Sequence, residues 1–315
     1  MWNKPWSIKE GFTIGAGLII LGLMLQISVG PIAWNYCRWP VNIILLAVFA
    51  AIIAIFYIFR HKVYFFNFIG TLQSGVPTIV YAVILTLILG LTRQTVDGEW
   101  LNDMLSFWPF VLIYVYLDFT LGIVIIKQCH TWFLYISKVL FSKNKIVFPY
   151  SRLFSTLFHL GLFLTLTCAT LGNADMHRLK TIVYTGRAEW RAMDSENRIR
   201  ELNITFELKK FTIETYEDGT PKRYASDLTI YTPDGQTIDT TIEVNHPFKY
   251  KGWKIYQSGY DPSSGPFHQS SILELIKDPW LPWVYTGVYI MLAGAVFMFL
   301  FSGKNPQNNK SLAVE

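Results

Sequence analysis

Charged residues are scarce in this chain of 315 residues. Asp, Glu, Lys and Arg make up 16% of it, whereas soluble domains average about 25%. Hydrophobic residues make up 52% of the chain. This composition excludes a wholly soluble globular protein and predicts an integral membrane protein.

Paired cysteines and enzyme signatures are also missing. Cys37, Cys129 and Cys168 form no CxxC pair, which argues against a disulfide framework, a zinc site and a dithiol redox site. The sequence contains no GxSxG, HExxH, Walker A or GxGxxG motif, so nothing indicates soluble-enzyme catalysis. The net charge of +5 does not predict a nucleic-acid partner, because the basic residues collect beside apolar runs.

Apolar runs of about 20 residues are what the chain does contain, and a helix of that length crosses a bilayer core. Six such runs predict six transmembrane helices: Phe12–Trp34, Val41–Phe59, Val76–Leu91, Phe107–Ile126, Ser151–Gly172 and Trp283–Phe301. The first run lacks a small-residue cleavage site, so we expect a retained span and not a removed signal peptide. The aromatic-aliphatic stretch Trp132–Phe141 predicts a separate amphipathic helix in the membrane interface.

The basic residues predict the orientation. The positive-inside rule places the loops that carry Arg60, Lys62 and four lysines after the fourth run in the cytoplasm. Both termini are then cytoplasmic, and the polar segment between the last two runs is extracytoplasmic. The expected location is the inner (plasma) membrane.

That polar segment has the pattern of β-structure. Apolar and polar residues alternate over most of Asn203–Tyr216, and Asp218-Gly219 and Asp234-Gly235 supply turns on either side of a further strand. The pattern predicts about five to seven antiparallel strands in a small sandwich or a curled sheet. Its 14 basic and 16 acidic residues between Asn173 and Trp280 nearly balance, which argues against a polyanion-binding face.

One histidine lies inside a predicted span. His159 is about eight residues from the start of the otherwise mostly apolar run Ser151–Gly172. An imidazole at that depth indicates a functional site, unless it hydrogen-bonds a neighbouring helix as packing glue. A membrane haem held by two histidines needs one from each of two facing helices. This chain has a single mid-span histidine, so a second ligand would come from another chain.

Asp118 and His177 are two further candidates. The fourth and fifth runs cross in opposite directions, so we expect Asp118 and His159 at similar depth and predict that Asp118 accepts a hydrogen bond from His159. The alternative is that Asp118 faces a water-filled cavity or another helix. His177 follows the fifth run and either faces a ligand at the mouth of a membrane cavity or is solvated.

Four stretches carry a resemblance to a known family. They are VNHPFKYKGWKIYQSGYD (residues 244–261), FTIETYEDGTPKRYASDL (211–228), DPWLPWVYTG (278–287) and HLGL (159–162). Together they resemble the ResB (also CcsB) family of cytochrome c biogenesis proteins. The family plan of four spans with an outer domain before the last corresponds to residues 66–172, 173–280 and 281–301. Residues 1–65 are then an extra N-terminal transmembrane hairpin, and residues 302–315 a cytoplasmic tail.

The resemblance implies a function in the system II pathway. Such proteins work with a CcsA-type membrane subunit to carry haem b across the membrane and attach it to CxxCH motifs of apocytochrome c. It implies that His159 is an axial haem ligand paired with one from that partner, and a thioredoxin-like thiol reductant is a further candidate partner. The tryptophan-rich motif of the CcsA-type partner is absent, so we expect one subunit of a haem lyase and not a complete enzyme. The alternative is a non-catalytic membrane scaffold whose outer β-domain docks a secreted partner.

Overall fold

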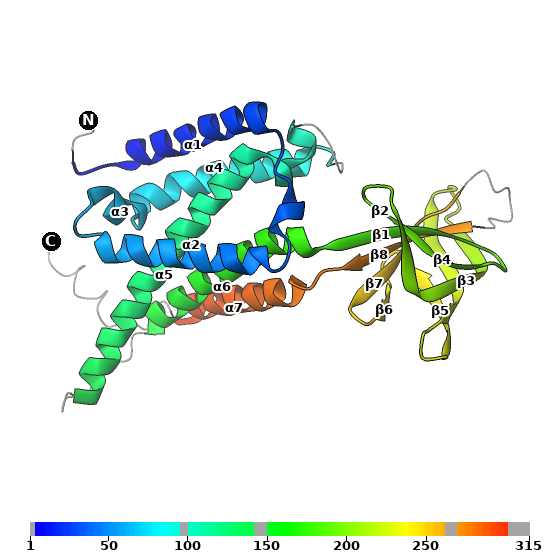
Figure 1. Ribbon diagram of the computed structural model, residues 1–315. Helices are drawn as coiled ribbons and strands as arrows, with labels where there is room; N and C mark the ends of the chain where they lie inside the picture. Colours follow the sequence, from blue (N-terminus) through cyan, green and yellow to red (C-terminus); the bar gives the residue numbers. More distant parts are fainter. Residues whose placement is uncertain (1–3, 95–99, 142–149, 262–269, 302–315) are drawn as a thin grey trace. The chain divides into compact units, whose positions relative to one another are not determined.

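The computed structural model describes residues 4–94, 100–141, 150–261 and 270–301. The chain divides into two compact units: Met1–Ala174 together with Trp280–Glu315, and Asp175–Pro279 (Figure 1). The first unit is helical and the second is a β-sheet. The tail predicted at residues 302–315 lies outside the described residues.

Within the described residues, six helices of the first unit are long and apolar enough to cross a membrane. They are α1 (Ile8–Val29), α2 (Val41–Phe59), α4 (Leu72–Leu91), α5 (Trp108–Phe141), α6 (Tyr150–Asp175) and α7 (Leu281–Phe301). A short helix, α3 (Tyr64–Ile69), lies between α2 and α4. The predicted class, a helical membrane protein with six spans and a separate β-domain, is confirmed.

Two predicted helix boundaries are wrong. α1 begins after Ser7, whose side chain accepts from the Lys9 N–H while Glu10 accepts from the Ser7 N–H, and it ends before Gly30. Gly30 has a φ of 85° and precedes a proline, so the helix cannot continue to Trp34. The predicted interface helix Trp132–Phe141 is the continuation of α5, because no glycine or proline interrupts the chain between Val124 and Phe141.

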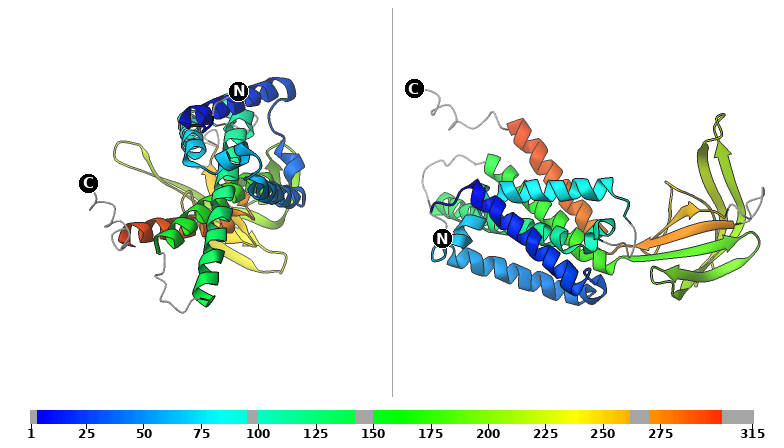
Figure 2. Two further views of the ribbon diagram at one scale, coloured as in Figure 1. Left: turned by 90° about the vertical axis from the view of Figure 1, so that its left-hand side faces the viewer. Right: turned by 90° about the horizontal axis from the view of Figure 1, so that it is seen from above.

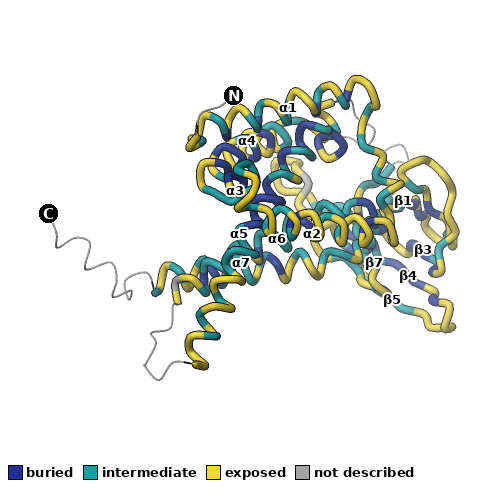
Figure 3. The backbone as a smooth tube through the Cα atoms, turned by 60° about the vertical axis from the view of Figure 1, so that its left-hand side comes forward, coloured by how far each residue is buried: buried dark blue, intermediate teal, exposed yellow. Residues whose placement is uncertain are grey.

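α1 and α2 pack directly on the other helices of their unit. α1 contacts α4 and α5, and α2 contacts α5. Glycines allow the close approach: a Cβ at Gly11 would lie 2.3 Å from the Gln73 carbonyl oxygen, and a Cβ at Gly22 would lie 2.6 Å from the backbone of Pro109. Buried residues of α4 and α5, including Ala82, Leu85 and Ile113, pack together in a core of this unit. Buried positions are dark blue on the tube in Figure 3.

α6 and α7 lie side by side and touch through their backbones (Figure 2). A Cβ at Gly161 would lie 2.3 Å from the Met291 nitrogen, and one at Gly287 would lie 2.8 Å from the Thr165 nitrogen. Small residues at a helix interface permit this approach in a membrane. This contact fixes the position of the helix that carries His159.

The second unit is one antiparallel sheet of eight strands in the order β5-β4-β3-β2-β1-β8-β7-β6. The strands are β1 (His177–Tyr184), β2 (Ala188–Asp194), β3 (Ile199–Thr215), β4 (Pro221–Tyr231), β5 (Thr237–Glu243), β6 (Phe248–Tyr250), β7 (Trp253–Gly259) and β8 (Ser270–Lys277). The edge strand β5 also contacts β6 and β7, so the sheet curls round a core that includes Phe206, Ile230 and Leu273.

The curled sheet was one of the two predicted forms, and the sandwich alternative is wrong. The two Asp-Gly turns are confirmed: Gly219 joins β3 to β4 and Gly235 joins β4 to β5, both with positive φ. The eight strands exceed the predicted five to seven, because β1, β2 and the short β6 were not expected from the sequence. β2 contains a register shift between Glu189 and Arg191, which breaks the alternation that marks a strand.

Candidate functional site

His159 lies on α6 with its ring held by its own helix. Its Nδ1 is 2.7 Å from the carbonyl oxygen of Ser155, one helical turn earlier. A carbonyl only accepts, so Nδ1 carries the proton and donates. In the neutral ring Nε2 then keeps its lone pair, the form in which imidazole binds a metal. A backbone carbonyl on the other ring nitrogen is a usual support for a metal-binding histidine.

Gln128 on α5 stands beside this histidine. Its Nε2 is 3.5 Å from His159 Nδ1 and 3.3 Å from the hydroxyl of Ser155. Its Oε1 is buried and has no hydrogen-bond partner among the described residues. With Nδ1 of His159 protonated, Gln128 Nε2 donates to the Ser155 hydroxyl and not to the ring, so Gln128 links α5 to Ser155 and leaves one buried acceptor free for a ligand.

A cavity of about 440 Å³ adjoins these residues, within the usual range for small-molecule sites. It is lined from α5 by Lys127, Gln128, Thr131, Trp132 and Tyr135, and from α6 by Arg152, Ser155 and Thr156. Trp132 Nε1 donates to Thr156 Oγ1 at 3.1 Å and so ties the two walls together. The cavity combines aromatic walls, hydroxyls and two cations.

The sequence prediction missed these lining residues, although a signal was available. Arg152, Ser155, Thr156 and His159 recur at i, i+3, i+4 and i+7, which places them on one face of α6. In an otherwise apolar span such a polar stripe indicates a cavity or a ligand path. The prediction from sequence considered His159 by itself and not the polar stripe to which it belongs.

Asp118 is not paired with His159 as predicted. Its Oδ2 accepts from Thr167 Oγ1 at 2.6 Å, inside the helical unit. Thr167 is eight residues beyond His159 on α6, a rise of about 12 Å. The depth argument failed because α5 extends well past Ile126, so that Gln128, and not Asp118, is level with His159. A supporting role of Asp118 for a ligand at His159 stays a prediction.

His177 belongs to the other unit. It is exposed on β1, where its backbone pairs with Lys277 of β8, and its ring centroid is 6.5 Å from that of Trp253. Its role toward a ligand also stays a prediction. Among residues 4–94, 100–141, 150–261 and 270–301, no group of three or more His, Cys, Asp or Glu side chains could hold a metal ion. His159 thus offers one nitrogen, enough for one axial position of a haem iron.

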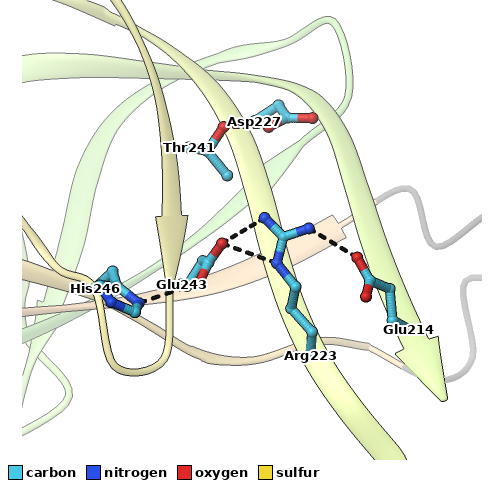
Figure 4. Close-up of polar contacts among 6 residues, drawn as sticks. All are labelled: Glu214, Arg223, Asp227, Thr241, Glu243 and His246. Atoms are coloured by element: carbon cyan, nitrogen blue, oxygen red, sulfur yellow. Dashed lines mark hydrogen bonds and ion pairs between the residues drawn. The ribbon is translucent and has the colours of Figure 1, made fainter. Parts of the chain in front are cut away.

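An ion-pair network in the β-domain joins β3, β4 and β5 to the segment after β5 (Figure 4). Arg223 on β4 donates to Glu243 at 2.9 Å and to Glu214 at 2.8 Å, and His246 Nδ1 lies 3.2 Å from the second oxygen of Glu243. The hydrogen bonds from Arg223 hold the pKa of Glu243 below its ordinary value, and His246 adds a smaller lowering. The network supports the turn between β5 and β6.

We expect Glu243→Gln to lower the thermal unfolding midpoint of the full chain in detergent at pH 7 by no more than a few degrees, because the pairs are exposed. A carboxyl with a lowered pKa in the folded state stabilises fully above its ordinary value of 4.5, and this contribution is lost as the pH falls through the lowered value. The midpoints of Glu243→Gln and the unchanged protein should therefore converge in acid. Glu217→Gln, in the exposed β3–β4 turn, is the control, and a difference independent of pH would contradict the assignment.

Comparisons with known proteins identify relatives of part of the chain. Residues 149–268 match the model of the ResB-like family. Cytochrome c biogenesis protein CcsB of Prochlorococcus marinus (strain NATL1A) is 33% identical over 109 residues, which are 35% of this chain and 25% of that protein. The protein of the same name from Synechococcus sp. (strain CC9311) is 31% identical over 104 residues, 33% of this chain and 23% of that protein.

The matched region thus spans about a quarter of the length of these relatives. A solved structure of Cytochrome c Heme Lyase CcmF aligns with a TM-score of 0.40 and 14% identity, over 93% of this chain and 46% of that chain. At that TM-score we draw no conclusion from it. The family match includes α6 from Tyr150 onward, and therefore His159, together with most of the β-domain.

Proposed function

We propose that the chain is a subunit of a system II cytochrome c synthase, a proposal supported by the match of residues 149–268 to the model of the ResB-like family. In this proposal His159 binds haem b, the transported substrate, and the protein helps to move it across the membrane. The haem then meets the CxxCH thiols of apocytochrome c. One observation carries the proposal: the Ser155 carbonyl holds the Nδ1 proton of His159 and leaves Nε2 as a free ligand inside a span.

The chain supplies one axial ligand, so the second comes from a partner. A CcsA-type membrane subunit is the proposed source, and this chain is then one part of a haem lyase and not the complete enzyme. Thioether formation needs little more than placement, since the haem vinyl groups and the reduced thiols carry the reactivity. A thioredoxin-like reductant would keep those thiols reduced.

The proposed orientation rests on the distribution of basic residues. Lys127 on α5 and Arg60 and Lys62 after α2 lie at span ends that the positive-inside rule assigns to the cytoplasm. Both termini are then cytoplasmic, and the β-domain between α6 and α7 stands on the outer side. The protein would reside in the inner (plasma) membrane.

A scaffold without haem is the second candidate. It is favoured by apolar side chains exposed on β1 and β2, where Ile182, Trp190 and Met193 are each more than 40% exposed at 44%, 46% and 48%. Large exposed apolar residues on a β-domain suit the docking of another protein. In this case His159 would serve packing alone.

Maturation of a c-type cytochrome in cells tests the proposal. The full chain is produced with a CcsA-type partner and an apocytochrome in a host without its own pathway, and covalently bound haem is measured by peroxidase staining of denatured protein. We expect His159→Ala to abolish covalent attachment and His246→Ala, in the β-domain, to retain it. Equal attachment in the two variants, with both accumulating normally, would favour the scaffold.

A further inference from the structure

Two cations line the α5–α6 cavity without an acidic partner. Lys127 Nζ donates to the carbonyl oxygen of Gly70 at 2.8 Å, which uses one of its three donors. Arg152 stands on the facing wall. Among the described residues neither side chain has a carboxylate within ion-pair distance.

The sequence offers no nearby counter-charge. No Asp or Glu occurs between Phe119 and Ala174, or between Gly11 and Val96. Asp118 bonds Thr167, about 12 Å along α6 from the level of His159. Cations that face a partly enclosed cavity attract an anion, and here the anion must come from outside this chain.

The shape and spacing of the cavity narrow the kind of anion. Arg152 and His159 share one face of α6 and are seven residues apart, about 10 Å. Between them lie hydroxyls, and opposite stand the rings of Trp132 and Tyr135. His159 does not itself line the cavity, but its Nδ1 lies 2.7 Å from the Ser155 carbonyl oxygen and 3.5 Å from Gln128 Nε2, and both of these residues line it. The cavity therefore suits one edge of a flat aromatic molecule whose metal binds His159 and whose carboxylates reach the cations.

We propose that this cavity binds the propionate edge of the haem, with Arg152 and Lys127 pairing with its two carboxylates. The inference rests on the proposed function, since it requires haem iron at His159. The inference also predicts the orientation of the bound haem. Propionates and vinyls lie on opposite edges of the porphyrin, so the vinyl edge points away from Arg152, toward the C-terminal end of α6.

The test compares haem with haem dimethyl ester, which has the same ring and iron but no carboxylates. Each is reduced and titrated under carbon monoxide into the purified full chain in zwitterionic detergent. Carbon monoxide supplies the sixth ligand, so one protein histidine suffices. We expect the unchanged protein to bind haem about tenfold more tightly than the ester, as charge-assisted hydrogen bonds require.

Arg152→Gln is the variant that tests the inference, because replacing Lys127 would also remove its hydrogen bond to the Gly70 carbonyl. We expect this variant to lose about tenfold in affinity for haem while its affinity for the ester stays within about twofold. Lys138→Gln removes a charge from an exposed position of α5 outside the cavity and should change neither affinity. Arg152→Lys should recover part of the loss, because the charge remains.

Two results would overturn the inference. In the first, the unchanged protein binds haem and the ester with equal affinity, and binding still depends on His159. The propionates then do not contact the cations, and the proposed function stands. If, in addition, retention of phosphatidylglycerol depends on Arg152, the cations serve a lipid headgroup. Failure of the unchanged protein to bind either ligand overturns the proposed function as well.

Discussion

Replacing His159 by alanine should remove the Soret band of haem bound to the purified chain. With Nδ1 donating to Ser155, Nε2 of His159 is the one histidine nitrogen in mid-span, among the residues that the structure describes, that stays free for iron. Loss of a partner that merely orients a metal ligand costs about 10–100-fold in affinity, so loss of the ligand itself should cost at least about 100-fold. Ferrous haem titrated under carbon monoxide, followed by absorbance, measures this directly.

Two other histidines, one in the β-domain and one on α5, are the controls. His246 is exposed in the β-domain beside Glu243, and His130 on α5 packs edge-on against the ring of Tyr57. His246→Ala and His130→Ala should keep the band. A colourless unchanged protein, even when it is produced with a CcsA-type partner, would contradict the haem assignment.

Asp118→Asn in the same titration distinguishes the contacts seen in the structure from the Asp118–His159 pairing predicted from sequence. In the structure Asp118 accepts a hydrogen bond from Thr167, and the ring of His159 donates to Ser155. We therefore expect the haem affinity of Asp118→Asn to lie within about twofold of that of the unchanged protein. A tenfold loss would restore the supporting role predicted from sequence, because losing a carboxylate that hydrogen-bonds a metal-binding histidine has an effect of that size.

The membrane part of the fold was predictable because each span must bury about 20 apolar residues, which a single sequence displays. The end of α5 was not predictable from hydropathy. Trp132–Phe141 is apolar enough for an interface helix, and only the absence of a helix breaker indicates continuity with the span. That one error moved Asp118 to the wrong level and produced the mistaken pairing.

In the β-domain, too, some features were predictable from the sequence and others were not. β3 and the Asp-Gly turns follow local rules of alternation and positive φ, and they were found. The contact of β5 with β6 and β7, which curls the sheet, joins strands that are not neighbours in its hydrogen-bonding order. No local pattern encodes such a contact, so the choice between sandwich and curled sheet needed the structure.

Some residues of the candidate site could be predicted from the sequence and others could not. His159 stood out because an imidazole is expensive in a span. Its partner Ser155 lies at i−4 and follows from helix geometry once the stripe on α6 is noticed. Gln128 and Trp132 come from a different helix, and nothing in their own neighbourhood predicts which face of α5 meets α6.

Leucine at Gly161 should destabilise the helical unit more than any other substitution considered for it. A Cβ at this position would lie 2.3 Å from the Met291 nitrogen and 2.6 Å from the Gly287 carbonyl oxygen, and backbone atoms cannot turn aside as a side chain can. Overpacking of this kind costs about 3 kcal/mol or more when the neighbours are rigid. Because Gly161 is two residues from His159, separation of α6 from α7 should also lower haem affinity.

The measurement is thermal unfolding of the full chain in detergent, with the haem titration beside it. Gly161→Ala should fall between the unchanged protein and Gly161→Leu, and Gly287→Leu should reproduce the loss from the α7 side, where a Cβ would meet the Thr165 nitrogen at 2.8 Å. Gly17→Leu is the control, since no atom lies within 4 Å of a Cβ built on this exposed face of α1, and it should shift stability by no more than about 0.5 kcal/mol. Stability unchanged in both Gly161→Leu and Gly287→Leu would mean that α6 and α7 do not meet along this seam, and the position of His159 would then need another support.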